Sequence, residues 1–360
     1  MLTSFVDDGV LAGAVLLVSR DGQTHVEVAG KVAFDGPPME RDSLFRVASL
    51  TKPIVAAATM MLVDSGRLTL DSPVHDLLPE LASQPVLRRP DGPLDDVVPA
   101  VRAVTVRDLL TFRLGLGESD NAALRAREEE LELHTFGPPK PRSPLEPDEW
   151  IRRFATLPLQ YQPGERWQYG TSSDLLGVLI ARASGQPLGE FLDERIFTPL
   201  GMKDTGFTAS DPARLTTAYV GEEVFDTAAE SQWLTPPTFP TGSGGLVSTA
   251  DDFNAFAQML LSGGGGILSA ESARELTTDQ LTAEQRAAAS ATGFIEEGAG
   301  WGFGLSVGGG RYGWAGGLGA LWSTAPDQQT VVLLLTTRAI WTWPPELFAA
   351  FEGAFSSPAS

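Results

Sequence analysis

The chain has 360 residues, 42% of them hydrophobic, which predicts a soluble globular protein with a substantial core and two lobes. Asp and Glu outnumber Lys and Arg by 46 to 26, so the formal net charge is −20. Such an acidic surface repels phosphate groups and therefore excludes nucleic-acid and anionic-membrane partners from the prediction. The absence of cysteine rules out disulfides, thiolate chemistry and Cys-ligated metals.

The three histidines, His25, His75 and His134, lie far apart and share no metal-ligand spacing, so we predict no metal site and no cofactor. No apolar run reaches the length of about 20 residues that spans a bilayer. Residues 10–18 are apolar, but no basic residue precedes them, which argues against a signal peptide. We predict a cytoplasmic protein, and the sequence carries no signal for its oligomeric state.

The first predicted elements are the two strands of a hairpin, over residues 10–18 and 24–28, joined by a tight turn at Asp21 and Gly22. A short apolar segment then leads into a buried helix over residues 54–63, which ends at a Ser-Gly pair.

The middle of the chain is predicted to be mostly helical, whereas strands return near its end. Three helices are predicted, over residues 106–110, 174–183 and 250–261. The dense charge of residues 116–150 indicates a solvent-facing helix followed by a surface loop. Short strands punctuated by glycine fill residues 301–338 and end with Thr330–Thr336. This order predicts one sheet built from both termini, with a helical lobe inserted.

Ser49 and Lys52 form an S-x-x-K pattern at the start of the predicted helix over residues 54–63. Three residues make almost one helical turn, so both side chains lie on one face and an amine can reach a hydroxyl. A serine needs such a partner because it is a weak nucleophile by itself, and burial favours the neutral amine that acts as a base. The alternative is that Ser49 caps the helix and Lys52 is solvated, although a cation there opposes the helix dipole.

A literal G-x-S-x-G pattern at residues 304–308 is a second candidate for a nucleophile. A nucleophile elbow needs a helix after its serine and a histidine later in the chain, but glycines follow here and the last histidine is His134. We therefore interpret residues 304–308 as a strand.

Tyr169 lies in a predicted loop just before the apolar helix over residues 174–183. By itself it can be an amphipathic anchor. Together with Ser49 and Lys52 it becomes a candidate proton carrier, which takes the serine proton and later exchanges a proton with the leaving group or with water.

These motifs belong to a longer pattern, because the chain resembles the serine β-lactamase-like superfamily, and most of all its class C and family VIII esterase branch. The matching stretches run in family order over nearly the whole chain, at residues 45–52, 105–111, 163–169, 199–207 and 243–252. The resemblance implies a β-lactamase/transpeptidase-like α/β (α+β) fold, with an antiparallel sheet flanked by helices. It places an α/β domain over residues 1–74 and 236–360, and a mainly helical domain over residues 75–235.

Departures from the family pattern bear on the substrate. Thr171 stands where a β-lactamase of this type has an asparagine, and no lysine follows Lys203, so the family's Lys-Thr-Gly strand is replaced by Trp314-Ala315-Gly316. Exchanging a cation for an indole removes a carboxylate anchor and favours neutral esters. The alternative for Trp314 is a core aromatic on the sheet. Residues 111–115 also depart from the family's usual histidine-containing turn.

The resemblance further implies an oxyanion hole made by the backbone N–H groups of Ser49 and Gly317. Glycine at 316 and 317 lets that strand approach a substrate closely. The predicted function is a cofactor-free serine carboxylesterase that cleaves small-molecule esters of short or compact acyl groups through an acyl-enzyme on Ser49. Alternatives are an acyltransferase or amidase, a weak β-lactamase with the same nucleophile, and a catalytically silent binding module.

Overall fold

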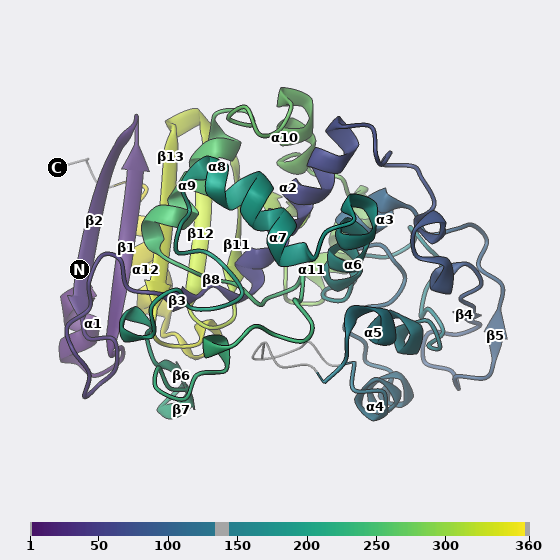
Figure 1. Cartoon of the computed structure of the whole chain (residues 1–360), viewed down its shortest axis with the longest axis horizontal. Coiled ribbons are helices and arrows are strands. Elements are labelled where there is room, and N and C mark those ends of the chain that lie inside the picture. Colours follow the sequence, from purple (N-terminus) through teal and green to yellow (C-terminus); the bar gives the residue numbers. More distant parts are fainter. Residues whose placement is uncertain (1, 134–143, 357–360) are drawn as a thin grey trace.

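The computed structural model describes residues 2–133 and 144–356, and its centre is a seven-stranded sheet in which every neighbouring pair is antiparallel. The order is β2-β1-β13-β12-β11-β10-β9, so the first strands of the chain lie beside the last (Figure 1). The strands are β1 (Gly13–Arg20), β2 (Gln23–Gly30), β9 (Gly300–Trp301), β10 (Ser306–Gly308), β11 (Arg311–Gly316), β12 (Ala320–Ala325) and β13 (Thr330–Thr336). This confirms the predicted antiparallel sheet built from both termini.

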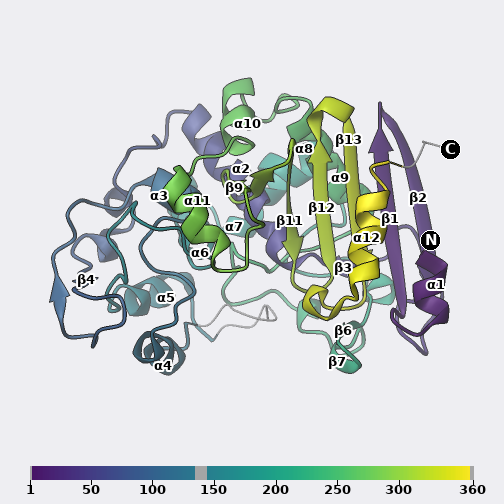
Figure 2. The ribbon, with the colours of Figure 1, turned by 180° about the vertical axis from the view of Figure 1, so that it is seen from behind.

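Both faces of the sheet are covered, and the central strand β13 is buried along its whole length. Val331, Leu333 and Leu335 pack into the main core, whereas Val332 and Leu334 join a second cluster on the other face, as the two-residue period of a strand requires. The main core includes α2 (Thr51–Asp64) and α9 (Ala250–Leu261), and the second cluster includes α1 (Leu2–Asp7) and α12 (Pro345–Gly353). Figure 2 shows α12 lying across its face of the sheet.

A mostly helical region extends from the far side of α2, at the opposite end of the molecule from β1 and β2 (Figure 1). Its central helix, α6 (Ser172–Ser184), packs against α2, α3 and α7. The other helices here are α3 (Val106–Leu110), α4 (Ala122–Glu130) and α5 (Pro147–Phe154). From α6 the chain returns toward the sheet through α7 (Leu188–Leu192), a π-helix (Asp193–Phe197) and α8 (Thr198–Leu200), which contacts α9 (Figure 1). Two more helices, α10 (Ala270–Leu276) and α11 (Ala283–Ser290), lie between α9 and β9 in the chain.

Three short antiparallel pairs complete the secondary structure. They are β3 (Phe45–Arg46) with β8 (Val247–Ser248), β4 (Val86–Leu87) with β5 (Val97–Val98), and β6 (Ala218–Val220) with β7 (Glu223–Asp226). Leu44 bridges to Leu215, so the segment before Ser49 contacts chain from the predicted helical domain. The proposed boundaries at residues 75 and 235 stay a prediction.

The predicted elements with a strong local pattern match the structure closely. Helices 106–110 and 250–261 and strand 330–336 have the predicted bounds, and residues 306–308 form a strand. In the charged segment, α4 is the predicted solvent-facing helix. Helix α5 was not predicted, because its buried Trp150 and Phe154 are flanked by charged residues. The part of the predicted surface loop at residues 134–143 lies outside the described residues.

Candidate active site

Ser49 is half-buried in a tight 3-10 turn, Ala48–Leu50, that leads directly into α2. Ala48 has φ of +47°, a left-handed conformation that costs free energy for a residue with a Cβ and persists where the surroundings enforce it. Thr51 supplies that enforcement. Its hydroxyl donates to the Ala48 carbonyl (2.7 Å) and accepts from the Leu246 N–H (3.3 Å). The turn therefore holds Ser49 in one defined place.

The structure brings Lys52 and Ser49 together within a single turn. The Lys52 Nζ donates to the Ser49 Oγ at 3.1 Å and to the Ser243 carbonyl oxygen at 2.5 Å. It also lies 4.7 Å from the centre of the Tyr169 ring, within the range of a cation–π contact. Lys52 is 2% exposed, so its Nζ is fixed by these three contacts rather than by water.

The carbonyl that holds Lys52 is itself fixed by Asp174, a buried residue in the first turn of α6. The Asp174 Oδ1 accepts from the hydroxyl of Thr241 and from the backbone N–H of Ser243 (3.2 Å). Neither Asp174 nor Ser243 is among the site residues predicted from the sequence. A backbone carbonyl leaves no side-chain signal, and the only sequence hint was that Ser243 begins one of the stretches that resemble the family.

Tyr169 is held by a hydrogen bond and by a cluster of aromatic rings. The Trp314 Nε1–H donates to the Tyr169 Oη at 3.0 Å, so Trp314 does more than fill the core beneath the sheet. The ring of Phe294 stacks on Tyr169, with their centres 4.5 Å apart, and Phe112 and Trp301 contact it at 5.9 and 6.5 Å. These contacts fix the orientation of the ring over Lys52.

Phe112 gives the unusual turn at residues 111–115 a structural role. It adopts φ of +56° and is fully buried, with its ring 4.8 Å from Trp301 and 6.3 Å from Trp167. An aromatic side chain at this position extends the apolar packing behind Tyr169. The sequence analysis found the departure but not this role, because the three rings come from distant segments.

The last residues of β11 lie beside the Ser49 turn and have an open edge. Strand β10 pairs with β11 only through residues 311–313, whereas Trp314 and Gly316 pair with β12 on the other side. A Cβ added to Gly316 would lie 2.2 Å from the Val47 carbonyl oxygen, so only glycine fits there. This close approach brings Gly317 next to the Ser49 turn. Thr171 lies two residues after Tyr169, at the start of α6.

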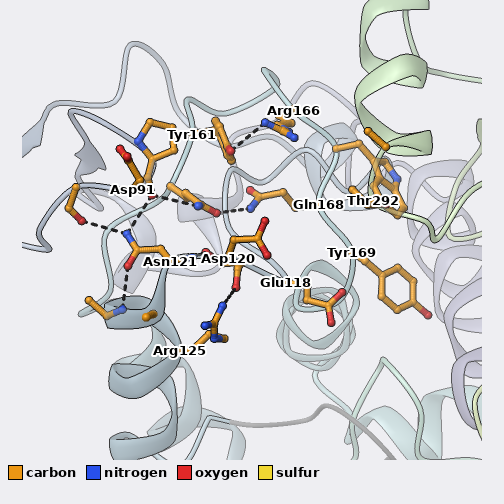
Figure 3. Close-up of a pocket in the computed structure, with 18 of the residues that line it drawn as sticks. Asp91, Glu118, Asp120, Asn121, Arg125, Tyr161, Arg166, Gln168, Tyr169 and Thr292 are labelled. Atoms are coloured by element: carbon orange, nitrogen blue, oxygen red, sulfur yellow. Dashed lines mark hydrogen bonds between the residues drawn. The ribbon is translucent and has the colours of Figure 1, made fainter.

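A cavity of about 960 Å³ opens against Tyr169. Of the three candidate catalytic residues, Tyr169 lines this cavity, whereas Ser49 and Lys52 do not. In Figure 3 the Tyr169 hydroxyl points away from Glu118 and Asp120. Residues 118–123 contribute to the wall, although their segment carried few sequence signals.

The cavity wall is polar and carries more acidic than basic groups. Glu118 and Asp120 face it, and burial together with the Asp120 carboxylate raises the pKa of Glu118. The two arginines of the wall already have partners, because Arg125 donates to the Ser119 carbonyl (2.8 Å) and Arg166 to the Tyr161 hydroxyl (3.0 Å). The wall therefore suits polar or hydrogen-bonding groups.

The G-x-S-x-G pattern has a structural explanation. Ser306 lies in β10, and its hydroxyl donates to the Gly300 carbonyl at 3.4 Å. Gly304 has φ of +72°, and a Cβ there would lie 2.9 Å from the Lys52 carbonyl oxygen. The first glycine of this pattern is thus required for close packing against α2.

Two absences apply to the described residues. Residues 2–133 and 144–356 contain no cluster of His, Cys, Asp and Glu side chains placed to bind a metal. In the same part of the chain, every helix is too short or too polar to cross a lipid bilayer.

The chain belongs to the beta-lactamase family, whose model matches residues 1–349. It is 38% identical over 356 residues to Protein Rv1367c of Mycobacterium tuberculosis, covering 91% of this chain and 86% of that protein. It is 32% identical over 321 residues to Esterase EstB of Burkholderia gladioli, covering 82% and 74%. The solved structure of EstCE1, described as a hydrolase with promiscuous acyltransferase activity, has the same fold, with a TM-score of 0.83, 23% identity and coverage of 98% and 96%. The chain is thus a serine hydrolase of the beta-lactamase family.

Proposed function

We propose that the chain is a carboxylesterase that forms an acyl-enzyme on Ser49. The observation that carries this proposal is the 3.1 Å contact between the Lys52 amine and the Ser49 hydroxyl, beneath the ring of Tyr169. The pairing of a hydroxyl with a buried amine is the arrangement that activates a serine. The similarity of this chain to Esterase EstB supports an ester as the substrate.

In the proposed reaction the Ser49 Oγ attacks the ester carbonyl while the neutral Lys52 amine accepts the serine proton. Tyr169 delivers a proton to the leaving alkoxide as the carbon–oxygen bond breaks, and Lys52 restores the tyrosine proton. The backbone N–H groups of Ser49 and Gly317 stabilise the oxyanion. Water then attacks the acyl-enzyme and passes its proton to the same groups, which releases the carboxylic acid and regenerates Ser49.

The surroundings of Tyr169 favour an ester over a β-lactam. In the segment Trp314-Ala315-Gly316 the Trp314 N–H donates to the Tyr169 hydroxyl, and no lysine stands there to bind a substrate carboxylate. The polar cavity beside Tyr169 gives room for the part of the substrate beyond the reacting carbonyl. We therefore propose a neutral ester of a compact acyl group with a polar remainder.

The test uses the wild-type protein with p-nitrophenyl acetate and butanoate, with nitrocefin, and with a fluorophosphonate probe. We expect ester turnover, at most slow nitrocefin turnover, and one probe adduct that peptide mass spectrometry locates on Ser49. Nitrocefin turnover comparable with ester turnover makes the chain a β-lactamase instead. Absence of both turnover and labelling favours the binding module.

Acyl transfer is the second candidate, because the cavity can hold an acceptor alcohol next to Tyr169. EstCE1, which has the same fold, is described as having promiscuous acyltransferase activity. The discriminating measurement is product partition during p-nitrophenyl butanoate turnover with increasing 1-propanol. A transferase yields mainly propyl butanoate at low alcohol concentration, whereas an esterase continues to yield mainly butanoate.

The hydrogen bond from Trp314 to Tyr169 makes a separate prediction. Trp314→Phe keeps an aromatic ring but removes the N–H donor, and we expect kcat for p-nitrophenyl butanoate to fall about tenfold, in line with the loss of one hydrogen bond. The control is a double-mutant cycle. In a Tyr169→Phe background the Trp314 substitution should have no further effect, and an undiminished loss there contradicts the proposed role.

A further inference from the structure

Trp341 is an exposed aromatic residue beside the proposed oxyanion donor. It lies in the 3-10 turn Ile340–Thr342, shortly after β13, and is 53% exposed. A Cβ added to Gly317 would lie 3.0 Å from the Trp341 Cζ3, so the indole rests directly against the Gly317 backbone. The position is thus adjacent to the reacting centre, on the Gly317 side.

The turn that carries the indole is fixed by hydrogen bonds. The Ile340 N–H donates to the Gly317 carbonyl at 3.0 Å, and the Arg338 Nε donates to the Thr342 hydroxyl at 3.0 Å. An exposed aromatic residue is by itself ordinary on a protein surface. This one is held in place by backbone contacts to Gly317, and among residues 2–133 and 144–356 no other aromatic ring stacks on it. Its exposed face is therefore available to a ligand.

We propose that Trp341 is a specificity-determining residue whose indole packs against an aromatic or branched aliphatic group of the substrate. The inference rests on the proposed function, because it takes the substrate carbonyl oxygen to lie at the Gly317 N–H. Both substituents of a carbonyl carbon lie within a few ångströms of its oxygen, so an indole that rests against Gly317 is within reach of one of them. The group that contacts the indole is apolar, and it belongs either to the acyl chain or to the alcohol of the ester.

Binding is measured first, so that the result does not depend on catalysis. In a Ser49→Ala background, isothermal titration calorimetry with 1-naphthyl acetate should show a Kd about five- to tenfold weaker after Trp341→Ala, as expected for the loss of one aromatic contact. Phe348→Ala is the matched control. Phe348 is similarly exposed at 40%, but it lies on α12, which covers the face of the sheet opposite α2, and its loss should leave Kd unchanged.

Two series of substrates then identify the group that contacts the indole. p-Nitrophenyl esters from acetate to hexanoate vary the acyl chain, and acetate esters of methanol, phenol and 1-naphthol vary the alcohol. We expect kcat/KM of Trp341→Ala to fall about tenfold for the apolar members of one series, through KM, with the smallest member little changed. Equal Kd values for Trp341→Ala and its parent, with flat ratios in both series, overturn the inference. A weaker Kd combined with no turnover by the wild type overturns the proposed function and leaves the Trp341 site standing.

Discussion

A Lys52→Met variant is expected to lose at least roughly 10³-fold in the rate of Ser49 acylation, the range of a lost general base and nucleophile activator. Methionine fills nearly the same volume, so packing around α2 is kept while the amine is removed. The Ser49 hydroxyl then loses its hydrogen bond to the amine, and the Ser243 carbonyl loses its partner. The measurement is the second-order rate of fluorophosphonate labelling, followed by intact-mass spectrometry, together with p-nitrophenyl butanoate turnover.

Two further variants serve as controls for the Lys52→Met measurement. Ser49→Ala sets the floor, with no labelling and no turnover above background. Lys203→Met makes the same chemical change at an exposed lysine and should leave both rates within about twofold, as is usual for a surface substitution. Retention of more than one tenth of the wild-type labelling rate in Lys52→Met would remove lysine from the proposed mechanism. A normal melting temperature in that variant shows that the loss is chemical.

The parts of the site that the sequence predicts are those set by local geometry. Ser49 and Lys52 are three residues apart where a 3-10 turn leads into α2, and this local spacing lets the Lys52 Nζ come within 3.1 Å of the Ser49 Oγ. Strand 330–336 and helix 250–261 are likewise predicted by continuous local patterns of apolar residues. In these cases the local pattern alone was enough to predict the element or the contact, although distant segments also hold it in place.

Features made by distant segments escaped prediction. The Ser243 carbonyl reaches Lys52 across 191 positions, and the Trp314 indole reaches Tyr169 across 145. The cavity wall combines residues 90–93 and 118–125 with chain near 160–169 and 291–294. A periodicity reports which face of an element is buried but not which element covers it. The resemblance to a known family supplied part of this long-range information for Tyr169 and Trp314.

A buried ion pair three residues before the nucleophile is the strongest candidate for a stabilising contact near the site. Arg46, 2% exposed in β3, donates from its Nε to the Asp226 Oδ2 at 2.9 Å and also contacts the Thr216 carbonyl. Ser231 donates its hydroxyl to the same carboxylate at 2.6 Å. Burial lowers the pKa of Arg46, and Asp226 opposes that shift. The pair thus links the end of β7 to β3, the strand that leads into the Ser49 turn.

Asp226→Asn is therefore expected to lower the free energy of unfolding by about 3–5 kcal/mol, because it leaves the Arg46 charge buried without its counter-ion. Urea denaturation measures this loss. The matched control is Asp251→Asn, which breaks the Arg41–Asp251 pair. That pair has two hydrogen bonds of 2.7 and 2.8 Å, but its side chains are 54% and 45% exposed, and its loss should cost at most about 1 kcal/mol.

A double replacement separates the cost of an unpaired charge from the value of the pair itself. Arg46→Met with Asp226→Leu removes both charges and keeps much of the buried volume, so it should be more stable than Asp226→Asn, since an apolar pair needs no compensation for desolvation. If the double variant is instead the less stable of the two, the hydrogen bonds of Arg46 to Thr216 and Ser231 stabilise the fold more than its charge destabilises it. Equal losses for Asp226→Asn and the exposed control would show that water reaches Arg46. Ester turnover measured on the same variants, at a temperature where each is folded, then tests whether this pair also positions the Ser49 turn.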